Sequence, residues 1–399
     1  MAGNRRSRIV RIVALAVLGA IIILGFGLVL RACAPHEQVT VGFIYDNDEK
    51  TPYSYDFYMS QETLQKAYGD DVRILMYSNV LDENIRTVAE HLSNNGCKVI
   101  FTNSYGNLLS LTREHPDVQY CQVSSEPIFE EAPPENYHTF KGEAYQGRYL
   151  SGVVAGLKLE EMIRTGSINK DDIQVGFVAA FPSSEVISGY TAFLLGVRSV
   201  VDTATMRVKY TYSWSDYIME KACATELLND GCTIISQHTD TIGPAIACEE
   251  YYARDVYHVG YNIDMTDVAP DVSLTSVRIN WTPYLLGSIQ AVLSHQRIED
   301  TVTGTVHGFN DMSGGLSDGW VELTPLNDAI LPDGVQSTVD TISKGLIDGS
   351  VHVFYGPYTG TNPDDPTDTI DLSTPYTENE NSSIPSFHYL LDDIVTVEE

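Results

Sequence analysis

The sequence predicts an α/β fold in which helices cover both faces of parallel sheets, arranged as two similar halves. Short apolar segments alternate with amphipathic helical segments from Val39 to Asp264, a pattern typical of parallel sheets. The apolar segments end in polar residues, as in ISQHTD (235–240). Two stretches, NNGCKVIFTNS (94–104) and LNDGCTIISQH (228–238), share a glycine, a cysteine and an apolar strand with a polar end. Two similar halves are the simplest explanation of this internal likeness.

The first half contains four predicted strands with helices between them. Each strand is a short run rich in β-branched and aromatic residues, and each helix shows apolar residues at helical spacing. The predicted strands are 39–46, 72–78, 98–104 and 118–124, and the predicted helices are 56–68, 82–95 and 108–115. Gly96 follows the second helix at a position where a positive φ costs little.

The second half repeats this alternation. Its predicted strands are 173–181, 206–214, 232–240 and 256–264, and its predicted helices are 185–201, 216–229 and 243–253. Gly231 is the counterpart of Gly96 at the end of a helix. After Pro357 the chain becomes polar, acidic and rich in proline, which predicts a long loop or a partly disordered segment. The final stretch FHYLLDDIVTVEE is apolar again and is expected to pack back onto the protein.

Composition excludes one class of partner. The 399 residues suffice for a large core and two domains. Lys and Arg number 24 against 54 Asp and Glu, which gives a formal net charge of −30. Because nucleic-acid binding requires a basic surface, we expect no nucleic-acid partner.

The N-terminus has the features of an export signal. Four arginines up to Arg11 precede the apolar run 12–30, which is also long enough to span a bilayer. Leu30, Ala32 and Cys33 then resemble a bacterial lipobox, although Arg31 departs from the usual small residue. Two outcomes are open, a lipid attached to Cys33 after cleavage or an uncleaved transmembrane anchor. Both place residues 34–399 outside the cytoplasmic membrane and tethered to it.

Motifs for catalysis or metal binding are absent. The sequence has no GxSxG, HExxH, P-loop or GxGxxG motif, and no CxxC or Cys/His metal spacing. Beyond Cys33 the cysteines are most simply small buried residues, although one or two disulfides remain open outside the cell. They are Cys97, Cys121, Cys223, Cys232 and Cys248. We therefore expect no cofactor, no metal and no catalytic residue.

The polar strand ends indicate where a ligand binds. In open α/β sheets, ligands lie beyond the carboxyl ends of the strands. Asn103, Ser104 and Tyr105 occupy this place in the first half, and residues 237–240 occupy it in the second. If the halves face each other, both loops line one cleft.

Seven stretches of the chain resemble the basic membrane protein family, the nucleoside- and purine-binding lipoproteins of ABC importers. They are spread over residues 143–357, in the order of the family. They are EAYQGRYLSGVVAG (143–156), VGFVAAFPSSEVISGYTAFLLGVRSV (175–200), IISQHTDTIGPAIACEE (234–250), YHVGYNIDM (257–265), LTSVRINWTPYLLGSIQAVL (274–293), GGLSDGWVELTPLND (314–328) and GSVHVFYGP (349–357).

The resemblance implies a type I periplasmic-binding-protein fold. Two Rossmann-like lobes with parallel sheets would be joined by a three-segment hinge and would close on a purine base or nucleoside. The partners would be an ABC permease and its ATPase. The implied division is 1–33 signal peptide or membrane anchor, 39–141 with 268–297 as lobe 1, 142–264 with 302–357 as lobe 2, and 358–399 as an acidic tail.

The resemblance also implies ligand contacts. Asn103, Ser104 and Tyr105 would reach the base or ribose, and Asp240 would accept hydrogen bonds from it. Aromatic residues would stack on the base or enclose it. They are Tyr53, where relatives have a Gly-Trp segment, together with Phe181, Trp214 and Trp281.

The last strand outlet of the second half departs from the family. Gly260, Asn262 and Asp264 form it, and nucleoside-binding relatives have an Asp that grips ribose where this chain has Asn262. An asparagine still forms hydrogen bonds but loses their charge-assisted strength, which weakens the case for a nucleoside over a free base.

Other interpretations stay open. Tyr53 could pack on the surface, Phe181 could belong to the core, and Asp240 could cap the following helix. A receptor of the same fold could bind a sugar or another small molecule for signalling. Less favoured are a nucleosidase using Asp240 or Asp264 and a purely structural role.

Overall fold

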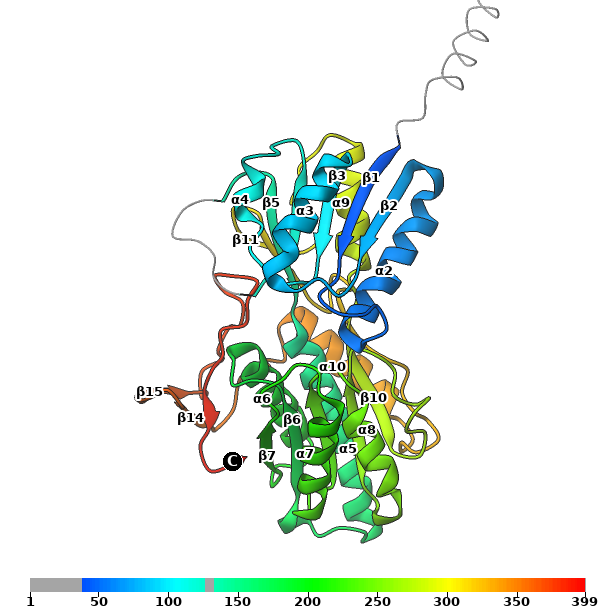
Figure 1. Cartoon of the computed structure of the whole chain (residues 1–399). Helices are drawn as coiled ribbons and strands as arrows, with labels where there is room; N and C mark the ends of the chain where they lie inside the picture. Colours follow the sequence, from blue (N-terminus) through cyan, green and yellow to red (C-terminus); the bar gives the residue numbers. More distant parts are fainter. Residues whose placement is uncertain (1–37, 126–132, 399) are drawn as a thin grey trace, which may run out of the picture.

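Two sheets of seven strands each form the two lobes of the protein in a computed structural model, which describes residues 38–125 and 133–398 (Figure 1). In lobe 1 the strand order is β11-β12-β5-β4-β3-β1-β2, and every pairing is parallel except that of β11 with β12. The strands are β1 (Val39–Ile44), β2 (Val72–Tyr77), β3 (Cys97–Thr102), β4 (Gln119–Val123), β5 (Tyr137–Gly142), β11 (Thr305–Gly308) and β12 (Asp311–Gly314). The helices of this lobe are α2 (Pro52–Tyr68), α3 (Ile85–Asn94), α4 (Leu109–Thr112) and α9 (Thr282–Leu293).

Lobe 2 has the strand order β13-β10-β9-β8-β6-β7-β17, in which β13 alone among these pairings is antiparallel. Its strands are β6 (Gln174–Ala179), β7 (Thr205–Tyr210), β8 (Ile234–His238), β9 (Tyr257–Tyr261), β10 (Ser273–Ile279), β13 (Val321–Leu323) and β17 (Val395–Glu398). Its helices are α5 (Ala144–Thr165), α6 (Ser184–Arg198), α7 (Tyr217–Asn229), α8 (Gly243–Glu250) and α10 (Val335–Asp348). The predicted α/β class with parallel sheets is confirmed.

Glycines fix two local features of this fold. Gly96 and Gly231 have φ of 84° and 96°, as expected for residues that end a helix in the left-handed region. Gly152 of α5 and Gly196 of α6 let these helices approach closely. A Cβ atom on Gly152 would lie 2.1 Å from the carbonyl oxygen of Phe193, and one on Gly196 would lie 2.1 Å from that of Tyr149. The two helices therefore pack backbone against backbone.

The strand pairings divide the chain differently from the division implied by the resemblance. Strand β10 lies within 268–297, the segment expected in lobe 1, but it pairs in parallel with β9 of lobe 2. The hairpin β11–β12 lies within 302–357, expected in lobe 2, but it pairs with β5 of lobe 1. Three segments of the described chain therefore cross between the lobes, at 142–144, 279–282 and 314–321.

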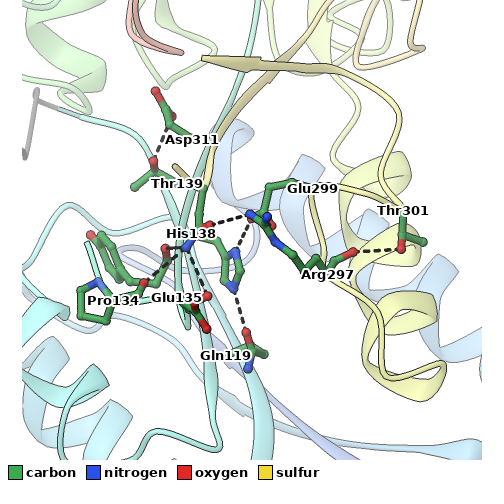
Figure 2. Close-up of polar contacts among 11 residues, drawn as sticks. Gln119, Pro134, Glu135, His138, Thr139, Arg297, Glu299, Thr301 and Asp311 are labelled. Atoms are coloured by element: carbon green, nitrogen blue, oxygen red, sulfur yellow. Dashed lines mark hydrogen bonds and ion pairs between the residues drawn. The ribbon is translucent and has the colours of Figure 1, made fainter. Parts of the chain in front are cut away.

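A buried hydrogen bond between a histidine and a carboxyl group fastens the segment after α9 to the lobe 1 sheet (Figure 2). His138 of β5 contacts Glu299 through its Nδ1 atom, 2.5 Å from the carboxylate, and both side chains are 3% exposed. The other ring nitrogen, Nε2, lies 2.8 Å from the Oε1 atom of Gln119. This contact holds the segment that leads from α9 into β11 and β12.

The acidic tail contains strands where the composition predicts a loop. Strands β14 (Thr359–Asn362) and β15 (Asp365–Asp371) form an antiparallel hairpin, and β16 (Leu390–Leu391) pairs with β14. The chain then ends in β17, which lies parallel to β7 in the lobe 2 sheet. The final stretch therefore packs back onto lobe 2 as expected, whereas the polar part before it forms strands where a loop was expected.

The predicted lipobox cysteine Cys33 and the apolar run 12–30 lie outside the described residues. Within 38–125 and 133–398, no helix is long and apolar enough to cross a membrane. The five cysteines of the described part, Cys97, Cys121, Cys223, Cys232 and Cys248, are all buried and free of disulfides.

Candidate ligand-binding site

Polar groups that follow the strands of the two lobes come together between them. Lys141, at the end of β5, donates a hydrogen bond of 2.8 Å to Glu185 in the first turn of α6, so that an ion pair links lobe 1 to lobe 2. Asp46, which follows β1, is close enough to Asp240, which follows β8, to raise its pKa. The strand outlets of both halves therefore face one interlobe region, as the sequence predicts.

Asp46 lies at the centre of the lobe 1 side. Its backbone N–H donates to the Oδ1 atom of Asn103 at 3.0 Å, and its carboxylate accepts from the hydroxyl of Ser54 at 2.9 Å. The side-chain amide of Asn103 donates to Ser54 at 3.1 Å and closes the triangle. Burial raises the pKa of Asp46. Asn103 thus fixes the position of Asp46 on the lobe 1 side of the interlobe region. Asp46 was not among the residues predicted from the sequence.

Ser104 and Tyr105 have different roles although they are neighbours. The Ser104 hydroxyl donates to Asp82 at 2.6 Å, so this side chain is engaged within lobe 1. Tyr105 lies against the interlobe region, where the ammonium of Lys141 is 5.9 Å from the centre of its ring. Burial raises the pKa of the Tyr105 hydroxyl well above its usual value, and the charges of Glu185 and Asp46 act in the same direction.

Tyr53 stands between the interlobe region and the lobe 1 core. Burial and the neighbouring Tyr105 raise the pKa of its hydroxyl, which lies 3.5 Å from the Asn103 carbonyl. Its ring meets the edge of Trp281 at a centroid distance of 6.3 Å. Trp281 is only 2% exposed and packs in the lobe 1 core against Phe57 and Phe140. This position favours a packing role for Trp281, which contacts Tyr53 from the side of the lobe 1 core.

A row of aromatic residues forms the lobe 2 side. The rings of Phe181 and Trp214 are 5.6 Å apart, those of Trp214 and His238 are 6.1 Å apart, and those of His238 and Tyr261 are 4.5 Å apart. Phe181 and Trp214 are half-buried, whereas His238 is 2% exposed. Phe181 and Trp214 therefore keep part of their aromatic surface exposed, and His238 packs behind them.

Asp240 is buried beside these rings. Its backbone N–H donates to the Trp214 carbonyl at 2.7 Å, and its carboxyl group accepts from the amide of Asn262 at 3.3 Å. Burial raises the pKa of Asp240 well above its usual value, and the charges of Asp46 and Glu220 act in the same direction. Helix α8 has Ile242 as its N-cap and no side-chain cap, so Asp240 does not cap it. The helix-cap interpretation is therefore wrong.

Of the three residues expected at the end of β9, only Asn262 contacts Asp240. Asn262 is 1% exposed, has a φ of 65° and donates to Asp240. Gly260 allows close packing, because a Cβ atom there would lie 2.3 Å from the Ser276 hydroxyl. Asp264 is exposed and accepts hydrogen bonds from the backbone and hydroxyl of Thr266. Gly260 thus allows close packing of β9 against β10, whereas Asp264 is engaged in its own exposed turn.

Arg148 is a buried cation that the sequence reasoning missed. Its side chain is fully buried, donates to the Gln237 carbonyl at 2.8 Å and lies over the Tyr261 ring at 4.0 Å. Burial lowers its pKa to about 10. The sequence feature that could have indicated this buried cation is a single arginine in the stretch QGRYLSG, which has two glycines and a serine. Arg148 holds the end of β8, from which His238 and Asp240 project.

The arrangement is suited to binding. No group of three or more metal-ligating side chains occurs within the described residues. Carboxyl groups from both lobes, tyrosine hydroxyls and half-buried aromatic rings meet between the sheets. Such a set of rings and rim partners is what a flat polar ligand requires.

Comparisons with known proteins define the class. The chain aligns with a "Purine-binding protein BAB2_0673" of Brucella abortus at 28% identity, over 82% of this chain and 86% of the relative. A "Putative ABC transporter glucose-binding protein TsgA13" of Haloferax volcanii aligns at 28% identity, over 49% of this chain and 46% of that protein.

Solved structures show the same fold. A solute-binding protein of an ABC transporter system from Aeropyrum pernix superposes with a TM-score of 0.62 at 15% identity, covering 82% of this chain and 94% of that one. A solute-binding protein from Conexibacter woesei superposes with a TM-score of 0.58 at 19% identity, covering 79% of this chain and 98% of that one. The fold is therefore that of type I periplasmic solute-binding proteins.

The fold and these relatives define a substrate-binding protein of ABC transporters. The model of one family, described as "ABC transporter substrate-binding protein PnrA-like", matches residues 38–351. The chain belongs to this family, which is the one indicated by the sequence motifs. Its homologues are binding proteins of importers and not enzymes.

Proposed function

We propose that this protein captures a purine base or nucleoside between its lobes and delivers it to an ABC permease and ATPase. The observation that carries the proposal is Asp240, a buried carboxyl group beside the half-buried rings of Phe181 and Trp214. A purine presents a flat face and an edge of alternating donors and acceptors. A carboxyl group with a raised pKa can donate as well as accept, which matches such an edge.

Asn262 supports a free base over a nucleoside. Its amide donates to Asp240, so Asn262 would act with Asp240 on the edge of the base and would not be free to bind the ribose hydroxyls. The neighbouring Asp264 is engaged in its own exposed turn. A neutral amide also binds hydroxyls less strongly than a carboxylate does.

A sugar receptor is the second candidate, because one relative is named as a glucose-binding protein. Polar groups that line the interlobe region, such as Lys141 and Glu185, could hold sugar hydroxyls. The aromatic row would then cover the apolar face of the sugar ring.

Co-purified ligand separates the two candidates. We would purify the full chain in detergent without added ligand, denature it and identify the released small molecules by mass spectrometry. A stoichiometric purine is the expected result, and the presence of ribose would decide between base and nucleoside. A stoichiometric sugar, or no ligand together with no heat of binding for adenine, adenosine or guanosine, would refute the proposal.

We further propose that a lipid on Cys33 tethers the protein outside the cytoplasmic membrane. Intact-mass analysis of the protein from its native membrane tests this. A diacylglycerol-modified N-terminal cysteine is expected, and an intact chain beginning at Met1 would show the uncleaved anchor instead.

A further inference from the structure

The C-terminal segment 352–398 lies beyond the matched family region, which ends at residue 351, yet it is built into lobe 2. The rings of Phe354 and Phe387 stack at 4.5 Å, and both belong to the lobe 2 core together with Leu372 and Leu391. The segment ends in β17, where Glu398 pairs with Arg207 and Lys209 of β7. Both ends of the segment are therefore fixed to lobe 2.

Between these ends the segment reaches lobe 1. The backbone N–H of Ser383 donates to the Oδ2 atom of Asp311 in β12 at 2.8 Å, and the hydroxyl of Ser382 donates to the same atom at 3.3 Å. The Ser383 hydroxyl lies 2.5 Å from that of Ser124, which follows β4. In Figure 1 the red C-terminal segment runs along the side of lobe 2 up to the base of lobe 1.

These contacts lie beside both partners of the interlobe ion pair. The Ser124 carbonyl accepts a hydrogen bond from the Lys141 ammonium at 2.9 Å, and Lys141 pairs with Glu185 of α6. Ser188, one turn further along α6, lies beside the carboxyl group of Glu378 in the C-terminal segment. Ser124 thus connects the segment to Lys141, and Glu378 lies one helical turn from Glu185 on the other side of the interlobe contact.

The two attachments differ in chemistry. The lobe 2 attachment buries aromatic and aliphatic side chains, whereas the lobe 1 contacts made by Ser382 and Ser383 are hydrogen bonds. A hydrogen bond contributes little net free energy because water replaces it when it breaks, whereas exposing apolar core is costly. Separation of the lobes would therefore release the segment from lobe 1 and leave it on lobe 2.

We propose that residues 376–387 form a latch, in which Ser382 and Ser383 act as positioning residues that favour the closed arrangement of the lobes and slow ligand release. The effect on ligand release rests on the proposed binding function, but the effect on the lobes does not. By linkage, any contact that exists only in the closed state raises affinity for a ligand that binds that state.

Locking the latch is the first test. In the full chain, purified in detergent, Ser124→Cys and Ser383→Cys place two thiols where the hydroxyls touch, and all five native cysteines of the described part are buried. When the two introduced cysteines are oxidised to a disulfide and no ligand is added, we expect peptides covering 103–107 and 181–186 to exchange hydrogen more slowly than in the wild type. Reductant should restore the wild-type rates in the same sample.

Breaking the latch is the second test. Ser382→Ala combined with Ser383→Ala should speed this hydrogen exchange and accelerate release of bound adenosine by about tenfold, as expected for the loss of two hydrogen bonds. The matched control is Ser373→Ala with Thr374→Ala, at exposed positions of the same tail, which should change neither rate.

Two outcomes would overturn the latch. One is a cross-link that forms but leaves interlobe exchange at the wild-type rate. The other is a double-alanine variant in which exchange rises in 376–387 alone, which would make the segment mere packing. If neither adenine nor adenosine binds, the exchange rates without ligand still decide the latch, and only the purine assignment fails.

Discussion

Asp240 illustrates, at the scale of single residues, how its position in the fold changes the chemistry of a carboxyl group. It follows the end of β8, is 8% exposed and is surrounded by acidic groups from both lobes. Burial and these charges together raise its pKa, since both disfavour the ionised form. A ligand that donates to this carboxyl group, or accepts from it, adds to the one long hydrogen bond that Asn262 donates.

Replacing Asp240 should weaken ligand binding. Asp240→Ala removes a buried hydrogen-bonding group, and we expect a loss of about 1–3 kcal/mol in the binding free energy of the purine, measured by calorimetry. Asp264→Ala is the matched control, because Asp264 lies in the loop after β9 but is exposed. An Asp240→Ala protein that folds and binds as tightly as the wild type would remove Asp240 from the site.

The buried contact between Glu299 and His138 predicts an effect on stability alone. Glu299→Ala leaves the buried imidazole without its hydrogen-bond partner, and such a loss costs about 1–3 kcal/mol. Glu160→Ala, at an exposed position of α5, should cost little. Urea denaturation of the two variants checks this difference. A Glu299→Ala variant with the midpoint of the wild type would show that this pair contributes nothing net.

Sequence patterns predict the residues at strand ends better than those that support them. Asn103, Asp240 and Asn262 follow apolar runs, so their place is readable from the chain. Arg148 and Lys141 lie inside a helix and a strand, and only the packing of α5 and β5 brings them to the interlobe region. Trp281 was expected at the ligand because of its aromatic ring, but the same ring is equally suited to the core.

At the scale of elements, the alternation of apolar and amphipathic segments was sufficient to predict β1 to β4 and β6 to β9. The tail was misjudged because β15 is exposed along most of its length, so it lacks the apolar alternation that marks a strand. Strand β15 is held by its pairing with β14, and the tail as a whole is held by the buried rings of Phe354 and Phe387. Such partners are distant in sequence and are invisible to a local pattern.

Glu378 in this tail predicts a pH-dependent stability. Burial raises its pKa from 4.5 to about 7, so the folded protein binds this proton more tightly than the unfolded chain does. The contribution is therefore fully present below pH 4.5 and is lost as the pH rises through 7, by about 3 kcal/mol in total.

The comparison of Glu378→Gln with the wild type isolates this group from the other acidic residues. The unfolding free energy of the wild type minus that of the variant should fall between pH 4.5 and 7 and then level off. Chemical denaturation at a series of pH values measures it. A difference that stays constant across this range would mean that Glu378 has an ordinary pKa.

At the scale of the whole molecule, the two lobes are joined in a way that the order of elements alone does not reveal. Strand β10 and the hairpin β11–β12 each lie in the lobe opposite to the one expected, because strand pairing across long sequence separations decides membership of a sheet. The sequence motifs identified the family and the two-lobed fold, but the crossing points depend on pairings that no local pattern encodes.

Truncation tests whether the C-terminal segment is part of the fold. The family match ends at residue 351, but removing 352–399 would strip Phe354, Leu372, Phe387 and Leu391 from the lobe 2 core. Each fully buried large apolar side chain contributes about 1.5–3 kcal/mol, so the loss is comparable to the whole stability of a typical domain. We expect the truncated chain to be unfolded or aggregated, as judged by circular dichroism and thermal denaturation. Removing only 395–399 deletes the edge strand β17 and should lower the melting temperature while leaving lobe 2 folded. A protein ending at residue 351 that melts at the wild-type temperature would show that the tail is an appendage rather than part of the core.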